Sequence, residues 1–191
     1  GNCPQLSFTE IDRYPATGID NTRINLLIKK SLFLITKKSN VIITAPSQLL
    51  LNKAKISHLR KFRIEKLNYG IDIDTWKIVV RISDKEKYFK NIKRYVTFIA
   101  NNVSEERKGF MFLLNNYQVF HENNLHLLIV GRHDQLNLTS SDYPLFHFLG
   151  SISNKSSLVS VLSNSQCTLI PSIADNFPFV GLESLSCGTP I

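Results

Sequence analysis

Two acidic residues near the end of the chain stand in a pattern that suits sugar binding. Asp175 and Glu183 lie eight positions apart in "IADNFPFVGLESLSCGTPI", and Pro178 suits the first turn of a helix, which would place Glu183 in its second turn. Carboxylates accept paired hydrogen bonds from sugar hydroxyls, each worth about 1.5–3 kcal/mol when charge-assisted. The spacing therefore fits a site in which the helical glutamate binds a ribose diol and the loop acid binds the next sugar. It fits equally an exposed aspartate in a turn and a glutamate on a solvated helix face.

The segments around these acids alternate between strand and helix patterns. The strands are apolar runs, as expected when both faces of a sheet are covered, and Asn154 stands where it would cap a helix. The strand runs are residues 94–100, 125–131, 144–150 and 167–172, and the helical ones are 108–122, 154–165 and 179–187. Such alternation with short connections predicts parallel strands and right-handed crossovers, that is, a doubly wound α/β sheet.

Several conspicuous residues follow the predicted strands. Asn101, Gly131, Gly150 and Asp175 stand at carboxyl ends, where ligands bind in open α/β sheets. Glycine lets a ligand approach the backbone closely, and helix amides at such ends favour an anion such as phosphate. We therefore predict a site for a phosphate-bearing ligand, although there is neither a Walker A loop nor a G-x-G-x-x-G motif. Each glycine alone is equally compatible with a tight turn.

The first half of the chain is more basic and less regular. Its patterns predict a helix over 24–35, a short strand over 41–47, a helix over 47–59 capped by Ser47, a strand within 62–76, and a polar linker with a short helix over 77–94.

The net charge of +8 is concentrated in this first half. Residues 1–95 hold 19 Lys and Arg against 8 Asp and Glu, whereas residues 96–191 hold 4 against 7. A basic surface suits nucleic acid, an anionic membrane or an acidic acceptor, and equally a lysine-rich solvated face. Nucleic acid is not expected as a partner, because no reading motif or interleaved aromatic residues accompany the charge.

Cysteine content and hydropathy exclude further classes. Cys3, Cys167 and Cys187 are widely scattered without metal-ligand spacing, which favours reduced thiols in a cytosolic protein and no bound metal. No apolar run approaches the roughly 18 residues of a membrane span. The first residues contain neither Met nor a signal pattern.

Longer motifs carry a family resemblance. "PSIADNFPFVGLESLSCGTPI" closely resembles the donor-site segment of retaining glycosyltransferases of family 4. The resemblance continues upstream, where the motifs occur in the order of that family: "VIITAPS", "LNYGIDIDTW", "RKGF", "LHLLIVG", "FHFLGSIS" and "LSNSQCTLIPS". The opening "GNCPQL" is similar to its bacterial polysaccharide-type subgroup. The resemblance covers nearly the whole chain.

The resemblance implies a GT-B fold, with two Rossmann-like domains and the nucleotide sugar bound mainly by the second. Residues 1–75 would be the end of the acceptor-side domain, 76–93 a linker, and 94–191 the donor domain. Because two domains of ordinary size need about twice this length, we expect both to be incomplete and the chain alone to be inactive.

The same resemblance assigns roles to individual residues. Glu183 matches the acid that holds the ribose, Asp175 the acid (usually Glu) near the reacting carbon, and Lys108 the lysine that neutralises the diphosphate. The loop against the sugar is matched by Asn176, Phe177, Pro178 and Phe179, and the segment beside the nucleobase by Gly150, Ser151 and Ile152.

One position departs from the family pattern. Many members carry an arginine where this chain has Asn102, and the next basic residue is Arg107. A cation about 4 Å from the leaving diphosphate contributes about 4 kcal/mol at an effective dielectric near 20, so its loss would slow the reaction by orders of magnitude. Arg107 is a candidate replacement. However, adjacent residues of a helix do not share a face, so Arg107 and Lys108 would be expected to point in different directions.

The resemblance implies a metal-independent, retaining transfer of a sugar from a nucleoside diphosphate to an acceptor hydroxyl, in polysaccharide or glycolipid synthesis. The acceptor would be a saccharide or a lipid-linked one, and the protein cytoplasmic, with peripheral contact to the inner membrane face through its basic half. A second hypothesis is a non-catalytic transferase-like module, for which Asp175 and Asn102 would be the marks. A nucleic-acid binder rests on charge alone.

Overall fold

The structure is a computed structural model that describes residues 22–37, 41–79, 92, 94–133, 136, 138, 141–173 and 175–191. The chain forms two compact units, which divide between Tyr69 and Gly70. Each unit is built around its own parallel sheet.

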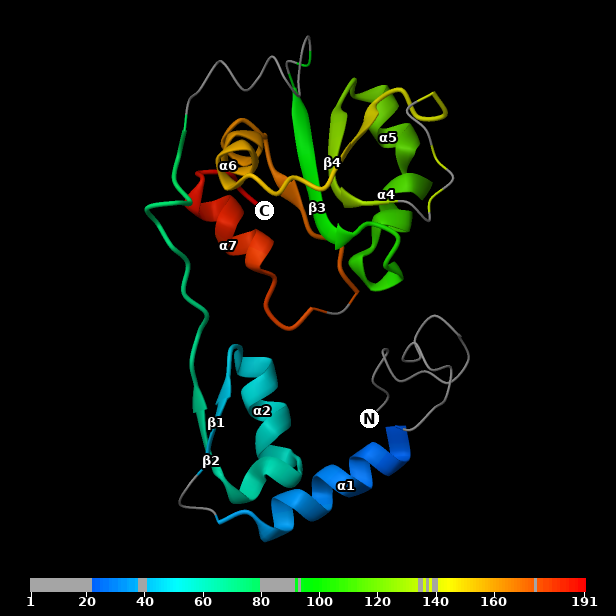
Figure 1. The fold of residues 1–191 in the computed structure, drawn as a ribbon. Coiled ribbons are helices and arrows are strands. Elements are labelled where there is room, and N and C mark those ends of the chain that lie inside the picture. Colours follow the sequence, from blue (N-terminus) through cyan, green and yellow to red (C-terminus); the bar gives the residue numbers. More distant parts are fainter. Residues whose placement is uncertain are drawn as a thin grey trace. The chain divides into compact units, whose positions relative to one another are not determined.

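The C-terminal unit contains a four-stranded sheet whose neighbouring strands all run parallel (Figure 1). Its strands are β3 (Tyr95–Asn102), β4 (His126–Arg132), β5 (Phe146–Gly150) and β6 (Thr168–Leu169). The spatial order is β5-β4-β3-β6. Because β4 lies on one side of β3 and β6 on the other, the order of the strands reverses next to β3. In doubly wound sheets such a reversal opens a crevice at the carboxyl ends of the two strands concerned.

Helices cover both faces of this sheet, as predicted. They are α4 (Phe110–Asn115), α5 (Tyr117–Glu122), α6 (Lys155–Ser163) and α7 (Phe179–Ser186), with a short 3-10 helix, η5 (Glu106–Lys108), before α4. Figure 1 shows α4 and α5 on one side of β3 and β4, and α6 and α7 on the other.

Alternate residues of the strands point to opposite faces of the sheet. Val96 and Phe98 of β3 pack with Phe110 of α4, whereas Tyr95 packs with Val161 of α6. These side chains are buried on both faces, which explains why the strands read as continuous apolar runs.

The helix predicted over 108–122 is divided in two at Asn116. The Asn116 side chain donates a hydrogen bond to the Phe112 carbonyl at 2.7 Å, and its backbone N–H bonds to Leu113 and Leu114. An asparagine side chain that competes for backbone carbonyls in this way favours a helix end over a helix interior.

A chain of buried hydroxyl groups connects α7 to the sheet. The Thr97 and Thr168 hydroxyls of β3 and β6 lie 3.0 Å apart, and the Ser184 hydroxyl of α7 lies 2.8 Å from Thr168. Ser184 also lies 2.9 Å from the Thr189 carbonyl. Because buried polar groups are costly unless they are paired, these bonds favour one position of α7 on the sheet.

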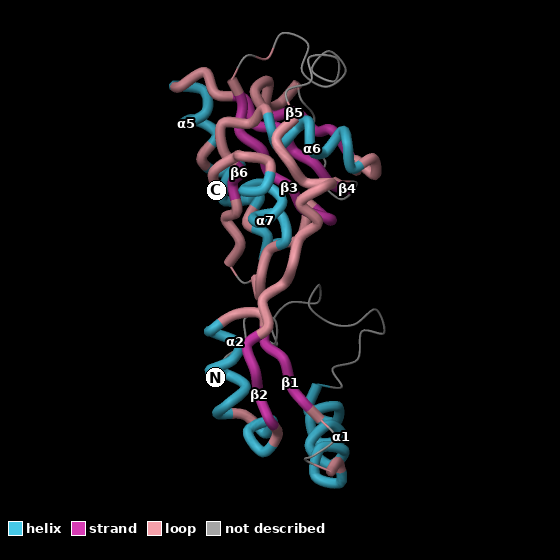
Figure 2. The backbone as a smooth tube through the Cα atoms, turned by 90° about the vertical axis from the view of Figure 1, so that its left-hand side faces the viewer, coloured by secondary structure: helices cyan, strands magenta, loops and turns pink. Residues whose placement is uncertain are grey.

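The N-terminal unit has a two-stranded parallel sheet with α2 connecting the strands (Figure 2). Its elements are α1 (Thr22–Ile35), β1 (Ile42–Ala45), α2 (Gln48–Ile56), the 3-10 helix η4 (His58–Lys61) and β2 (Arg63–Lys66). Ser47 caps α2 as predicted, since its hydroxyl accepts a hydrogen bond from the Leu50 N–H at 3.2 Å. None of the helices in the described ranges of either unit is long and apolar enough to cross a bilayer.

The division between the units precedes the boundary after residue 75 that was expected from the sequence. Trp76 is buried and packs with Val159, Leu162 and Cys187 of the C-terminal unit. The Ser186 hydroxyl donates to the Trp76 carbonyl at 2.5 Å. The segment before β3 therefore packs on this unit up to residue 79, and residues 80–91 and 93 of the expected linker lie outside the described residues.

Candidate functional site

The candidate site lies where β3 and β6 end, at the reversal of strand order. After β3 the Asn102 side chain accepts a hydrogen bond from the Ser104 N–H at 3.0 Å, and η5 follows. After β6 the Ile173 N–H donates to the Arg107 carbonyl at 2.9 Å. This backbone bond holds the loop that carries Asp175 against η5.

Gly109 makes this close approach sterically possible. Its φ is +78°, and a Cβ added there would lie 2.1 Å from the Pro171 carbonyl oxygen. Only glycine fits both the left-handed backbone and the lack of space. The sequence reasoning did not assign this residue, although the glycine that follows "RK" and precedes a helix was a usable signal.

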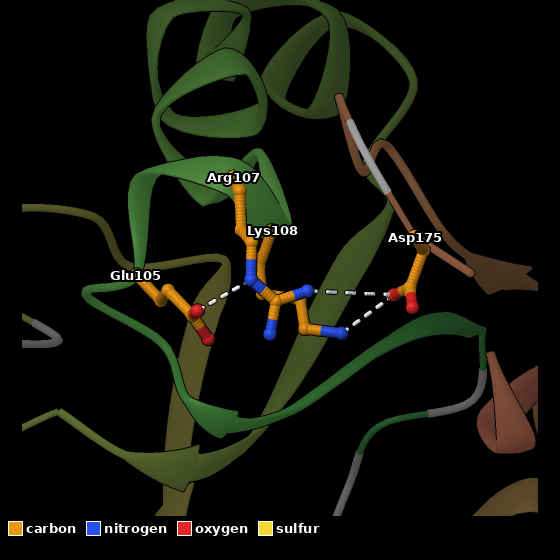
Figure 3. A network of polar contacts seen from close by, with 4 residues as sticks. All are labelled: Glu105, Arg107, Lys108 and Asp175. Atoms are coloured by element: carbon orange, nitrogen blue, oxygen red, sulfur yellow. Dashed lines mark hydrogen bonds and ion pairs between the residues drawn. The ribbon is translucent and has the colours of Figure 1, made fainter. Parts of the chain in front are cut away.

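Lys108 and Asp175 form an ion pair across the two loops (Figure 3). Lys108 Nζ lies 2.6 Å from Asp175 Oδ2, and the two side chains are only 21% and 18% exposed. Burial to this degree weakens screening by water, so the pair contributes more than an exposed surface pair. The structure thus brings together the two residues that were predicted as catalytic.

Arg107 also points toward Asp175. Its Nη1 lies 4.0 Å from Asp175 Oδ2, and its Nε donates to Glu105 Oε1 at 2.5 Å. The expectation that adjacent positions would face apart was wrong, because η5 is a single 3-10 turn and both long side chains bend toward the same carboxylate (Figure 3). Glu105 had not been singled out, since an acid two residues from an arginine carries no distinctive sequence signal.

Glu183 lies in the second turn of α7, where it was predicted. Burial raises the pKa of its carboxyl group, and the nearby Lys155 partly offsets this shift. Within the described part of the chain, its carboxylate has no hydrogen-bond or ion-pair partner. A half-buried carboxylate without a partner is suited to accept hydrogen bonds from a ligand hydroxyl pair.

The loop between the two acids is only partly covered. Asn176 is exposed, Phe177 and Pro178 are half-buried, and Phe179 is 48% exposed. Pro178 is the N-cap residue of α7 and gives it no side-chain hydrogen bond. An exposed aromatic ring beside a polar loop provides a surface on which a sugar can pack.

Two predicted glycines differ in their surroundings. Gly131 has φ +139°, and a Cβ there would lie 1.8 Å from the Ala100 carbonyl oxygen. The space at its Cα is therefore occupied by β3 rather than open to a ligand. Gly150 has φ +68° with nothing within 4 Å of an added Cβ. After Gly150, Ser151 is exposed and Ile152 is half-buried against the core.

The described residues contain no group of three or more His, Cys, Asp or Glu side chains that could hold a metal ion. The positive charges that face Asp175 in this part of the chain are those of Arg107 and Lys108.

Comparison with known proteins assigns the chain to a family. The family model described as "Glycosyl transferases group 1" matches residues 93–191, just over half of the chain. The chain therefore belongs to the group 1 glycosyltransferases. A search of curated proteins found no match.

Several solved structures have a similar fold. Sucrose-phosphate synthase from Thermosynechococcus elongatus matches with a TM-score of 0.63 and 17% identity over 90% of this chain and 45% of that one. Anabaena HepE in complex with UDP-glucose matches with a TM-score of 0.62 and 17% identity over 92% of this chain and 49% of that one. WaaG, a glycosyltransferase involved in lipopolysaccharide biosynthesis, matches with a TM-score of 0.62 and 16% identity over 90% and 48%. The predicted GT-B fold is confirmed, and the chain spans just under half the length of these structures.

Proposed function

We propose that the chain is the donor-binding part of a retaining glycosyltransferase of family 4, which moves a sugar from a nucleoside diphosphate to an acceptor hydroxyl. The observation that carries this proposal is the Lys108–Asp175 pair, with Arg107 beside it, at the strand reversal. Membership of the group 1 family supports it. The similar fold of HepE, which binds UDP-glucose, is consistent with it.

The diphosphate would bind at Lys108 and Arg107. Its negative charge increases as the bond between the sugar carbon and the phosphate oxygen breaks. Two positioned cations stabilise that developing charge, as donors do in an oxyanion hole. On binding, Lys108 would turn from Asp175 to share its protons with phosphate oxygens, and Asp175 would then accept a hydrogen bond from the donor sugar.

The new glycosidic bond forms on the same face of the sugar that the phosphate leaves. The acceptor hydroxyl gives its proton to the departing phosphate oxygen, so no protein side chain is needed as base. The two acids are not assigned the acid and nucleophile roles of glycosidases. Glu183 would instead hold the ribose hydroxyls, Asn176–Phe179 would lie against the sugar, and Gly150–Ile152 would lie beside the base.

We propose that the reaction needs no metal ion, because two cationic side chains face the expected diphosphate position. Adding EDTA or Mg²⁺ should then leave the affinity for nucleotide sugar within about twofold. A loss of more than tenfold with EDTA would show that a divalent ion takes part.

Binding of a nucleotide sugar is the direct test. We expect one of UDP-, GDP- or ADP-glucose to raise the thermal midpoint of the 191-residue chain and thereby to identify the base. Glu183→Ala should weaken binding about tenfold or more, since it removes the charge-assisted bonds to the ribose. Glu122→Ala, on the exposed face of α5, is the matched control.

An unchanged affinity in Glu183→Ala would remove the ribose assignment. If no nucleotide sugar stabilised the chain, the alternative of a non-catalytic transferase-like module would be favoured. That alternative draws on Asp175, which stands in place of the usual glutamate, and on Asn102.

The acceptor is proposed to be a saccharide or a lipid-linked saccharide, and the protein cytoplasmic with peripheral contact at the inner membrane face. The support is the positive charge of residues 1–95. Such binding to anionic vesicles should fall steeply between low and physiological salt, because exposed charges are screened over about 10 Å. Weak binding that salt does not change would contradict the membrane contact.

A further inference from the structure

We infer that Glu105 is a positioning residue that turns Arg107 toward the diphosphate site, so that Arg107 supplies the cation that the chain lacks at Asn102. The inference rests on the proposed function of this site and adds the means by which its second positive charge is set in place. It concerns the arrangement of Glu105, Arg107 and Asp175 in Figure 3.

The position of Glu105 in the local fold points to this role. Glu105 is the N-cap residue of η5, yet its side chain makes no capping hydrogen bond. A side chain at this position ordinarily accepts from a helix N–H. Its carboxylate instead accepts from Arg107 Nε at 2.5 Å. The side chain is therefore committed to the arginine rather than to the start of the helix.

The bond at Nε determines where the rest of the guanidinium points. The group is planar, with its donors in a fixed fork. When Nε donates to Glu105, Nη1 points away from Glu105 and lies 4.0 Å from Asp175 Oδ2. Lys108 Nζ lies 2.6 Å from the same oxygen. The two cations therefore converge on one point, which a diphosphate would take over from Asp175.

Without Glu105, the arginine would lose the hydrogen bond that fixes its Nε in this orientation. Its side chain is 33% exposed, and a partly exposed arginine has many accessible rotamers. The positive charge would then be distributed over several positions, and fewer of them would face the site. A cation that must be ordered by the ligand binds it more weakly than one that is already in place.

A role limited to charge would have the opposite consequence. A carboxylate near a diphosphate repels it, so loss of the Glu105 charge alone would tighten anion binding. Glu105→Gln and Glu105→Ala both remove the charge, but only glutamine keeps an oxygen that can accept from Arg107 Nε. The difference between these two variants therefore isolates positioning from charge.

The test is a double-mutant cycle on the 191-residue chain. The dissociation constants of inorganic pyrophosphate and of UDP, GDP and ADP are measured by calorimetry at low salt with EDTA. The variants are Glu105→Gln and Glu105→Ala, each with Arg107 and with Arg107→Ala. We expect Glu105→Gln to bind pyrophosphate about fivefold more tightly than Glu105→Ala when Arg107 is present. In the Arg107→Ala background the two should agree within about twofold.

Equal affinities of the two variants with Arg107 present would overturn the inference. A difference that persists after Arg107→Ala would also overturn it, because Glu105 would then act through another group. So would a wild-type chain that does not bind pyrophosphate. Glu122→Gln and Glu122→Ala, on an exposed helix face, are the control pair and should not differ.

The outcome also separates this inference from the proposed function. If the pyrophosphate difference is found but no nucleoside diphosphate binds, the proposed function fails and the positioning role stands. If a nucleoside diphosphate binds with equal affinity to both Glu105 variants, the positioning role fails and the proposed function stands. Thermal midpoints within about 2 °C of the wild type would show that the variants fold.

Discussion

The two ends of the four-stranded sheet each bring together a pair of titratable side chains, but of opposite character. At the carboxyl end, Lys108 and Asp175 carry opposite charges 2.6 Å apart. At the amino end, His126 Nδ1 and His147 Nε2 lie 2.8 Å apart, with their rings stacked at a centroid distance of 5.1 Å. The first pair is stable when both groups are charged, and the second when both are neutral.

The environment of the histidine pair favours its neutral form. Burial lowers the pKa of His126, and burial together with the neighbouring His126 lowers the pKa of His147. The hydrogen bond between the rings requires one of the two facing nitrogens, His126 Nδ1 or His147 Nε2, to be unprotonated so that it can accept. Under the proposed function, the polar groups at the carboxyl end exchange partners with a ligand, whereas the histidine pair at the amino end contributes to the stability of the fold. Changes at the carboxyl end should therefore affect binding, and changes at the amino end stability.

Lys108→Ala should have the largest effect on binding. We expect nucleotide-sugar affinity to fall about 100-fold, equivalent to about 3 kcal/mol, because a cation in contact with the diphosphate is lost. Calorimetry would measure this, with the exposed Lys77→Ala as control. If His147→Gln weakened binding as much, the separation of the two ends would be wrong.

Gly109→Ala should have the largest effect on stability at the carboxyl end. The left-handed φ and the 2.1 Å approach to the Pro171 oxygen require the loops to separate. We expect a loss of about 3 kcal/mol, which is a decrease in thermal midpoint of about 10 °C.

Gly150→Ala is the matched control, because its φ is also positive but nothing lies within 4 Å of the added methyl group. It should cost only about 1 kcal/mol of left-handed strain. Equal losses in the two variants would mean that contact with Pro171 does not decide the effect.

Acidification should act through the amino end. Because the folded pKa values of His126 and His147 are lowered, unfolding takes up protons below the unfolded value of about 6.5. The stability that the neutral pair contributes is complete above that pH and is lost as the pH falls through the lowered folded values. Each histidine can add at most about 1.4 kcal/mol per pH unit to the slope.

Urea unfolding at several pH values between 5 and 7.5 would measure this slope. His126→Gln together with His147→Gln should flatten it, whereas His121→Gln, at an exposed position of α5, should not. A slope that the double substitution left unchanged would assign the pH dependence to other groups.

Glu183→Gln should have the smallest effect on stability, and it should stabilise the chain rather than destabilise it. Burial raises the pKa of Glu183, so the folded chain prefers the protonated form, and this preference is lost as the pH rises through the raised folded pKa. At pH 7.5 the ionised group therefore costs stability. The amide should raise the thermal midpoint by about 1–2 °C, corresponding to about 0.5 kcal/mol.

At pH 4 the two chains should unfold alike, since the wild-type carboxyl group is then largely protonated. Differential scanning calorimetry of the wild type and of Glu183→Gln at pH 7.5 and pH 4 would test this. A decrease in midpoint at pH 7.5 would show that the carboxylate has a stabilising partner.

The sequence patterns located most elements of the C-terminal unit, and the family resemblance singled out Lys108 and Asp175. Neither predicted the division of the 108–122 helix at Asn116 or the contacts of Glu105 and Gly109. Periodicity located β3 and β4, and local chemistry located caps such as Asn154, whose side chain accepts from the Ser156 N–H at 2.9 Å. These features depend on neighbours along the chain. The orientation of Arg107 depends instead on the 3-10 turn of residues 106–108 and on its hydrogen bond to Glu105. The burial of Trp76 likewise depends on residues far along the chain, Val159, Leu162 and Cys187, against which it packs.

The buried hydroxyl chain has a consequence for how this site can vary. Ser184, the neighbour of Glu183, is hydrogen-bonded to Thr168 of the sheet, so the backbone that carries the proposed ribose-binding residue is attached to the sheet. The loop that carries Asp175 is connected instead to η5, through the Ile173 bond to Arg107 and the ion pair of Asp175 with Lys108. Under the proposed function, substitutions in that loop would therefore change the contacts to the sugar without shifting Glu183. The two halves of the proposed ligand would thus contact parts of the protein that can vary independently.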